Sequence, residues 1–332
     1  MTISARRRAL LLSTGALVAA HAALPRPATA QPGWPTRPVR LVVPFPAGGA
    51  TDIVARITAQ RLSTSLGQQV VVENRPGAGG TIGADAVAKA SPDGHVLLLS
   101  TSSTHSIGPA INPRLPYDAF RDFVPVAQIA NAPSVLVVGS AFPNGDARAL
   151  VAAVKAAPGK HNYGSSGIGT YPHLMAELFK WRAGGLFAVH IPYRGTGLVV
   201  PDLVAGQITF LMDSVVSAQP HLRDGKIRAL AVSGGRRSSA LPAVPTFAEI
   251  GIPGMEVSNW FGILAPAGTP ADVVQRVNRE VAAMLRQPDV MERLQTAGAE
   301  PATGTPEQFG KVVRDEYESW KAVISRAGIK PE

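Results

Sequence analysis

Three glycine-rich segments are the parts of this sequence whose residues could bind a small ligand. They are residues 44–52 (PFPAGGATD), 75–83 (RPGAGGTIG) and 164–170 (GSSGIGT), and a helical pattern follows each of them. Glycine lets backbone N–H groups approach a ligand without obstruction by a side chain, and the positive end of a helix dipole attracts anions. The pattern therefore predicts a site for a small anion.

The second segment has the glycine density of a dinucleotide-binding loop but not its spacing. That fingerprint requires glycine at positions 77, 79 and 82, and position 82 is Ile82. It also requires an acidic residue at the end of a following strand about 20 residues on, and the sequence has none there. We therefore expect neither a nucleotide nor any other cofactor.

The third segment leaves one enzymatic alternative open. Ser165 or Ser166, together with His173 and Asp213, has the side chains of a hydrolytic triad. The G-x-S-x-G motif is not satisfied, because the residue two positions after Ser166 is Ile168. A secreted cleft hydrolase that uses Ser166 and His173 is thus the alternative to a binding protein that is not an enzyme.

Composition narrows the remaining classes. The chain has no cysteine, and its seven histidines show no metal-binding spacing, so we expect no disulfide and no metal site. No Lys/Arg run of five or more residues occurs and aromatic residues make up only 6%, which argues against nucleic-acid binding. No stretch of about 18 residues is continuously apolar, so an integral membrane protein is not expected.

Residues 1–30 have the pattern of a cleavable export signal. Arg6, Arg7 and Arg8 precede an apolar stretch at 9–23, and a small-x-small site ends at Ala30. The arginine pair also fits a twin-arginine signal, so Sec and twin-arginine export both stay open. Removing this segment leaves 28 basic and 23 acidic residues, a mild net charge of +5 that suits the attraction of small anions. We expect a periplasmic protein.

The elements that must position these loops alternate between strand and helix. Strands are predicted at 39–45, 69–74 and 95–101, each followed by a loop, and helices follow the first two loops. This order predicts a parallel sheet covered by helices, with all three loops at the carboxyl ends of the strands. The third of these loops contains Ser102 and Ser103.

The middle of the chain repeats the strand and helix pattern. Further strands are predicted at 134–139, 161–166, 187–193, 207–214 and 227–234, and helices at 146–157, 171–184 and 197–206. Pro201 lies inside the last helix, where it should break or kink a turn. Asp213 closes an apolar strand, where its carboxylate can accept a hydrogen bond either from a ligand or from backbone N–H groups of a loop.

The C-terminal part is helical after a further strand at 255–266. Two apolar stripes are typical of core-facing helices: Val273, Val277, Val281 and Leu285 form the first, and Phe309, Val313, Tyr317, Trp320 and Ile324 form the second. We predict a first domain made of residues 34–133 plus 256–332 and a second domain made of residues 134–255.

Several longer stretches resemble one protein family. They are WPTRPVRLVVPFPAGGATDIVAR, VVVENRPGAGGTIGADAVAKASPDGHVLLLST, HIPYRGTG, QPHLRDGKIRALAVSGGRRSSALPAVPTFAEIG and WFGILAPAGTP. They are similar to Bug-type periplasmic solute-binding receptors of tripartite tricarboxylate transporters, over essentially the whole mature chain. The resemblance implies a two-domain α/β periplasmic-binding-protein (Venus flytrap) fold. It also implies a small organic carboxylate as ligand, membrane permease subunits as partners, and a monomer.

The resemblance also assigns ligand-binding residues in the cleft between the domains. The segment around Pro201 departs from the family pattern, which leaves the local shape of the cleft open. The matching positions are Phe45, Ala47, Gly48, Gly49 and Asp52 in the first segment, Ser165, Ser166, Gly169 and Thr170 in the third, Asp213 at its strand end, and Ser102 and Ser103 after the third strand.

Overall fold

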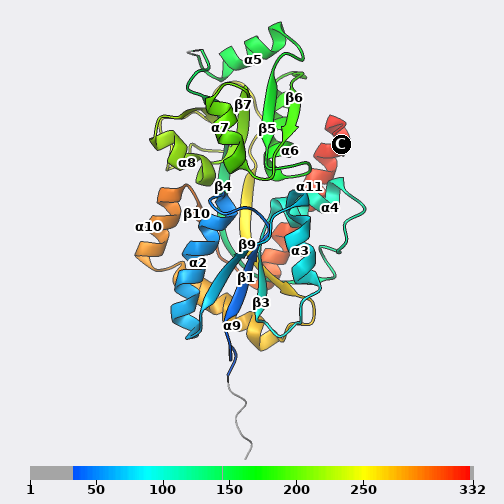
Figure 1. Cartoon of the computed structure of the whole chain (residues 1–332), viewed down its shortest axis with the longest axis vertical. Helices are drawn as coiled ribbons and strands as arrows, with labels where there is room; N and C mark the ends of the chain where they lie inside the picture. The colour runs from blue at the N-terminus through cyan, green and yellow to red at the C-terminus, as the bar shows by residue number, and fades with distance from the viewer. Residues whose placement is uncertain (1–32, 144, 330–332) are drawn as a thin grey trace, which may run out of the picture. The chain divides into compact units, whose positions relative to one another are not determined.

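Two β-sheets share one long strand, β4 (Phe123–Gly139), in the computed structural model of this protein. The structure describes residues 33–143 and 145–329, so the predicted signal peptide and its cleavage site lie outside the described residues. The folded unit that contains both sheets begins at Arg37. Within it, both sheets carry helices on their faces (Figure 1).

The first sheet contains the three parallel strands that the sequence predicts. They are β1 (Val39–Val43), β2 (Val70–Asn74) and β3 (Val96–Thr101), in the order β2-β1-β3. β9 (Ser258–Pro266) pairs antiparallel with β3 and, on its other side, with β4. A short strand, β10 (Glu300–Pro301), also pairs with β4. The sheet is therefore mixed rather than purely parallel, because the chain returns to it from the opposite direction.

The second sheet uses the far half of β4. It contains β5 (Asn162–Ser165), β6 (Val189–Pro192) and β7 (Phe210–Ser214), with β5 parallel to both of the others. β7 and β8 (Ile227–Val232) pair antiparallel with β4. The strands predicted for the middle of the chain are thus confirmed; four have shorter bounds, and the one predicted at 134–139 is the end of the longer β4.

β4 passes from one sheet to the other at the predicted domain boundary. Residues 123–133 of the strand pair with β9, and residues 134–139 pair with β7 and β8. Two segments cross this division: Ile107 and Ile111 pack in the core around β7, as does Trp320. The predicted division, residues 34–133 plus 256–332 against residues 134–255, therefore stays a prediction. The strand pairing follows this division, but the side-chain packing crosses it.

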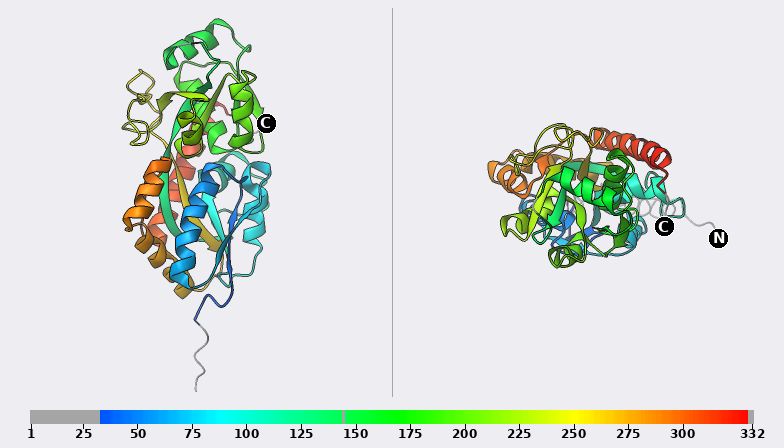
Figure 2. Two further views of the ribbon diagram at one scale, coloured as in Figure 1. Left: turned by 60° about the vertical axis from the view of Figure 1, so that its left-hand side comes forward. Right: turned by 90° about the horizontal axis from the view of Figure 1, so that it is seen from above.

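Helices cover the sheets. Those of the first sheet are α2 (Ala50–Leu66), α3 (Thr81–Ala88), α9 (Ala271–Met284) and α10 (Pro288–Ala297), and α9 and α10 lie beside α2 (Figure 2). Those around the second sheet are α5 (Ala147–Ala156), α6 (Tyr171–Arg182), α7 (Val199–Val204) and α8 (Val215–Arg223). Among the described residues, no helix is long and apolar enough to span a membrane.

The C-terminal helix α11 (Pro306–Ala327) contacts both cores. Phe309 and Val313 are buried with residues of the first sheet, and Trp320 is buried with residues of the second. Val273, Val277 and Val281 of α9 are buried as well. Both predicted apolar stripes therefore face the interior.

Two short helical turns follow the third strand where a loop was predicted. A π-helical turn, η3 (Ser103–Ile107), leads directly into α4 (Gly108–Ile111). A 3₁₀ turn, η2 (Ala78–Gly80), precedes α3, and another, η4 (Thr196–Leu198), precedes α7. The chain therefore re-enters helical structure immediately after β3, which fixes the direction of Ser102 and Ser103.

Pro201 is accommodated by a shift of the predicted helix. α7 begins at Val199, so Pro201 is its third residue and lies in the first turn. The first N–H groups of a helix have no partner within the helix, so proline loses no hydrogen bond at this position. The kink expected from a proline in the middle of this helix does not arise.

Candidate ligand-binding site

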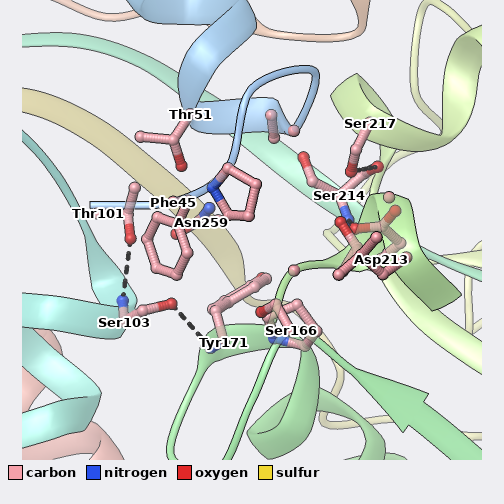
Figure 3. Close-up of a pocket in the computed structure, with 18 of the residues that line it drawn as sticks. Phe45, Thr51, Thr101, Ser103, Ser166, Tyr171, Asp213, Ser214, Ser217 and Asn259 are labelled. Atoms are coloured by element: carbon pink, nitrogen blue, oxygen red, sulfur yellow. Dashed lines mark hydrogen bonds between the residues drawn. The ribbon is translucent and has the colours of Figure 1, made fainter. Parts of the chain in front are cut away.

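A cavity of about 240 Å³ lies at the carboxyl ends of the parallel strands, where residues of both sheets meet. Figure 3 shows Thr51, Thr101 and Asp213 around this hollow. Its lining consists of Phe45, Pro46, Ala47, Gly49, Ala50, Thr51, Thr101, Ser103, Ser166, Tyr171, Pro172, Gly195, Thr196, Gly197, Leu198, Asp213, Ser214, Ser217 and Asn259.

The first glycine-rich segment contributes the largest share of this wall. It follows β1 and ends at Gly49, the N-cap of α2, whose first turn contains Ala50 and Thr51. Gly49 and Ala47 line the cavity, as predicted from the sequence. The backbone N–H groups at the start of α2 have no partner within the helix, so this wall carries donors for an anion.

Two predicted contact residues of this segment are instead occupied within the loop. The N–H of Gly48 donates to Asp52 Oδ2 at 2.9 Å, and neither residue lines the cavity. Asp52 is buried and also accepts hydrogen bonds from Arg56 Nε at 2.8 Å and from Asn74 Nδ2 at 2.9 Å. Burial opposes ionisation of Asp52, but these hydrogen bonds outweigh it and lower its pKa. The carboxylate holds the loop rather than a ligand.

We expect Asp52→Asn to destabilise the protein at neutral pH and much less in acid. Because the pKa of Asp52 is lowered in the folded protein, its ionised form stabilises the fold above the unfolded-state value of about 3.9. That stabilisation is lost as pH falls through the folded-state pKa. The variant should lose about 1–2 kcal/mol of unfolding free energy at pH 7.

Urea denaturation of both proteins from pH 7 down to pH 3 measures this difference. The control is Asp315→Asn, since Asp315 is exposed on α11. A gap between wild type and Asp52→Asn that stays constant over the whole pH range would contradict the role assigned to the carboxylate.

The third glycine-rich segment forms part of the opposite wall, with fewer contacts than predicted. Ser166 lines the cavity, and so do Tyr171 and Pro172 at the start of α6. The hydroxyl of Thr170 donates to Gly167 O at 2.6 Å, and Gly169 N donates to His173 Nδ1 at 3.1 Å. These polar groups form hydrogen bonds within the turn. Thr170 and Gly169 therefore stabilise the loop that carries Ser166 but do not line the cavity themselves.

Ser165 has a structural role as well. Its hydroxyl is fully buried, lies 2.7 Å from His190 Nε2, and accepts the N–H of Gly167 at 3.1 Å. In this loop it is therefore Ser165, rather than Ser166, that contacts a histidine. His173 is buried with its ring stacked on His190, 4.1 Å between centroids, and its Nδ1 is occupied by Gly169. Burial, with the nearby His190 and Lys180, lowers the pKa of His173 to about 3. The pairing of Ser166 with His173 on which the hydrolase alternative depends has no support in this arrangement.

Ser102 and Ser103 follow β3 but point in different directions. Ser103 lines the cavity, and its Oγ accepts the N–H of Tyr171 at 2.9 Å, which joins the two walls. Ser102 donates to Glu316 Oε1 at 2.8 Å, and Trp260 Nε1 donates to the same carboxyl group. Burial raises the pKa of Glu316. The helical turn at Ser103 separates the two hydroxyls, so Ser102 belongs to the core beneath the cavity.

Asp213 lies at the end of β7, faces the cavity and is 3% exposed. Its Oδ1 accepts the N–H of Ser214 at 2.8 Å. Burial raises its pKa to about 6, against the opposing effect of hydrogen bonds from Ser217, Ser214 and Thr196. The carboxyl group therefore holds the local loop, which is one of the two roles considered from the sequence, and contact with a ligand stays a prediction.

Sequence reasoning missed the loop after β6 and several hydroxyls. Gly195, Thr196, Gly197 and Leu198 line the cavity, although none of these four was assigned as a ligand contact from the sequence. The signal was present, because a loop that follows a parallel strand reaches the same sheet edge as its neighbours. Residues missed elsewhere are Pro46, Ala50, Thr51, Thr101, Tyr171, Pro172, Ser214, Ser217 and Asn259.

The lining combines apolar side chains with hydroxyl, amide and carboxyl groups. No lysine, arginine or histidine occurs among the described residues that line the cavity. Asn259 Oδ1 is buried and finds no hydrogen-bond partner within residues 33–143 and 145–329. A buried amide without a partner is costly unless a ligand or water satisfies it. In the part of the chain that the structure describes, no cluster of acidic, histidine or cysteine side chains is arranged to hold a metal.

The chain matches one protein family and is similar to several solved structures. The profile of the family described as TctC, the tripartite tricarboxylate transporter family receptor, matches residues 54–329. The solved structure of R. palustris Rpa4515 with adipate is 38% identical, with a TM-score of 0.88 over 90% of this chain and 100% of that one. MatC from Rhodopseudomonas palustris with bound malate is 35% identical, with a TM-score of 0.84 over 88% of this chain and 100% of the other.

The periplasmic binding protein BugD is similar to the same extent. It is 34% identical, with a TM-score of 0.86 over 90% of this chain and 100% of its own. These likenesses confirm the two-domain α/β fold of periplasmic binding proteins that the sequence predicts. The matched family and these neighbours consist of solute-binding proteins, not enzymes, which removes the hydrolase alternative.

Proposed function

Because this chain belongs to the TctC family of tripartite tricarboxylate transporter receptors, we propose that it captures a small organic carboxylate in the cavity between its two sheets. The observation that carries this proposal is the cavity itself, which is partly open and combines apolar walls with hydroxyls and backbone groups. Its volume, about 240 Å³, lies below the range of roughly 300–1,000 Å³ that drug-sized ligands occupy. The ligands named for the neighbours, adipate and malate, are both small dicarboxylates.

Capture depends on donors from both sides of the cavity. The start of α2 and the loop after β1 lie on one side, and the loops after β5, β6 and β7 lie on the other. A carboxylate that accepts hydrogen bonds from both sides favours the closed arrangement, because only closure brings both sets of donors within reach. Each hydrogen bond to a charged acceptor contributes about 1.5–3 kcal/mol net.

A screen of the purified mature protein against a carboxylate panel tests the proposal. The panel includes adipate, malate, a tricarboxylate, an aromatic acid and an amino acid, with uncharged amides of the same carbon skeletons as controls. A ligand at a hundredfold excess over its Kd stabilises the folded protein by about 2.7 kcal/mol, which a thermal-shift assay detects. Isothermal titration calorimetry then gives the affinity. A panel without a single carboxylate hit, or with equal hits for the amides, would refute the proposed function.

The cellular role that we propose is delivery of the bound carboxylate, by the monomeric receptor, to membrane permease subunits from the periplasm. The family match supports a permease partner, and the similarity to BugD supports the periplasmic location. Cleavage after Ala30 is expected on export. N-terminal sequencing of protein recovered from the periplasm measures it, and retention of Met1 would contradict cleavage.

A further inference from the structure

Asp213 is an unusual group to find in a site for anions. It is the single carboxylate among the described residues that line the cavity, and no basic side chain lines the cavity with it. An ionised Asp213 would therefore repel a bound carboxylate across a buried space without a cation to compensate. Two carboxylates that share such a site cannot both stay ionised without a large free-energy cost.

The elements packed around Asp213 bring polar groups but no cation to it. Ser214 donates its N–H at 2.8 Å, and the hydroxyls of Thr196 and Ser217 lie beside the same carboxyl group, with Ser217 Oγ donating to Ser214 O at 3.2 Å. β4 places Val135 beside it in the sheet. These partners come from η4, α8 and β4, the neighbours of the end of β7.

The charged groups on the neighbouring elements are paired with other groups or lie at the far end of their helix. Asp202 of α7 accepts the hydroxyl of Tyr193 at 2.6 Å. His221 and Arg223 lie in the last turn of α8, at the opposite end of that helix from Asp213, and Arg223 donates to Thr296 O. On α2, Asp52 is paired with Arg56. The start of α8 and the three donors favour an ionised Asp213, but burial outweighs them and raises its pKa to about 6.

We propose that Asp213 takes part in capture as a neutral carboxylic acid, which donates its proton in a hydrogen bond to a carboxylate of the ligand. The inference rests on the proposed function, because it needs a carboxylate in the cavity. The proton comes from solvent and stays on Asp213 in the complex, so each binding event well above pH 6 takes up one proton. A buried carboxylic acid that donates a hydrogen bond to an anion is a known solution to this problem in protein sites.

The proposal predicts how affinity depends on pH. Because burial raises the pKa of Asp213 to about 6 in the free protein, ligand binding must protonate it at higher pH, and affinity falls about tenfold for each pH unit up to the pKa of Asp213 in the complex. Between pH 7 and pH 9 the affinity for adipate or malate should fall about a hundredfold. Both ligands are fully ionised over that range, so the change comes from the protein.

Calorimetry measures the proton directly. Titrations at pH 7.5 in phosphate and in Tris, which differ in ionisation enthalpy, should give heats that differ by the enthalpy of one proton taken from the buffer. Asp213→Asn keeps the shape and supplies a permanent N–H donor. This variant should take up no proton, should lose the pH dependence, and should bind more tightly than wild type at pH 9.

Asp202→Asn is the matched control, since Asp202 is an aspartate of α7, next to the second sheet, that does not line the cavity. It should keep the wild-type pH profile. Carboxylate binding without proton uptake would overturn the inference and leave the proposed function intact. A ligand that binds more tightly as pH rises and is lost in Asp213→Asn would also overturn it, because that pattern requires an ionised Asp213 paired with a ligand ammonium group. If no carboxylate binds at any pH, the proposed function and this inference both fail.

Discussion

Gly49→Val is expected to abolish carboxylate binding while the protein stays folded. Gly49 lines the cavity as the N-cap of α2, with φ −78° and ψ 169°, a backbone conformation that any residue adopts. A Cβ at this position would meet only Pro46 O, at 3.6 Å, which is an ordinary contact. The branched side chain therefore fits the fold and occupies space that the ligand needs. Valine is a poor N-cap, so we expect a stability loss of about 1 kcal/mol.

The effect on affinity should be much larger than the effect on stability. Excluding the ligand from its donors at the start of α2 should weaken binding by at least about a hundredfold, or about 2.8 kcal/mol. Calorimetry with the ligand found in the carboxylate screen measures this loss, and circular dichroism checks the fold. Gly235→Val is the control, because Gly235 is exposed, lies outside the cavity and has no atom within 4 Å of an added Cβ. Unchanged affinity in Gly49→Val would place the ligand somewhere else.

Gly195→Ala is expected to weaken binding by holding the cavity open. Gly195, in the loop before η4, lies against Pro46 of the opposite wall, and a Cβ there would lie 2.8 Å from Cγ of the proline ring. A proline ring cannot swing aside, so the two walls must separate. If the closed form falls to about a tenth of its population, the apparent Kd rises about tenfold.

Two further variants distinguish separation of the cavity walls from backbone strain at Gly195. Gly195 has φ +145°, so alanine is strained there whatever the space, and Gly185→Ala provides a comparison with φ +78° and no neighbour within 4 Å of the added Cβ. Pro46→Ala removes the opposing ring and should restore part of the lost affinity when combined with Gly195→Ala, which a double-mutant cycle quantifies. Small-angle X-ray scattering without ligand should show a larger radius of gyration for Gly195→Ala alone. Strictly additive losses in the cycle would argue against the contact between the walls.

The position of the site was predictable from local patterns, but the direction of its side chains was not. Strands that alternate with helices place their loops at one sheet edge, and the family resemblance then pointed to Ala47, Gly49 and Ser166 within those loops. Whether a hydroxyl faces the ligand depends on the turn that carries it. Thr170 sits in a turn that uses its hydroxyl internally, and a hydrophobicity pattern does not contain that information.

The first half of β4 shows a second limit. Residues 123–133 contain Pro125 and Pro133 together with polar residues, so the segment does not have the pattern of a central strand. The structure accommodates Pro125 next to a shift in register with β9. Proline is tolerated at such irregularities, but the tolerance comes from the partner strand, which lies far away in the sequence. The antiparallel pairing of β9 with β3 and β4 could not be predicted for the same reason, because the partners lie far apart in the sequence.

The late position of β9 in the chain has a consequence for synthesis and export. β9 lies between β3 and β4, which leave the ribosome long before it does. Until residues 258–266 emerge, β3 and the first half of β4 have unpaired edges, and such edges are templates for aggregation. The segment that contains β5 to β8 is complete at that stage and can collapse first, as units of a growing chain generally do. A nascent chain of this protein is therefore most vulnerable in its N-terminal part, and a chaperone that shields β3 would be needed until translation is almost finished.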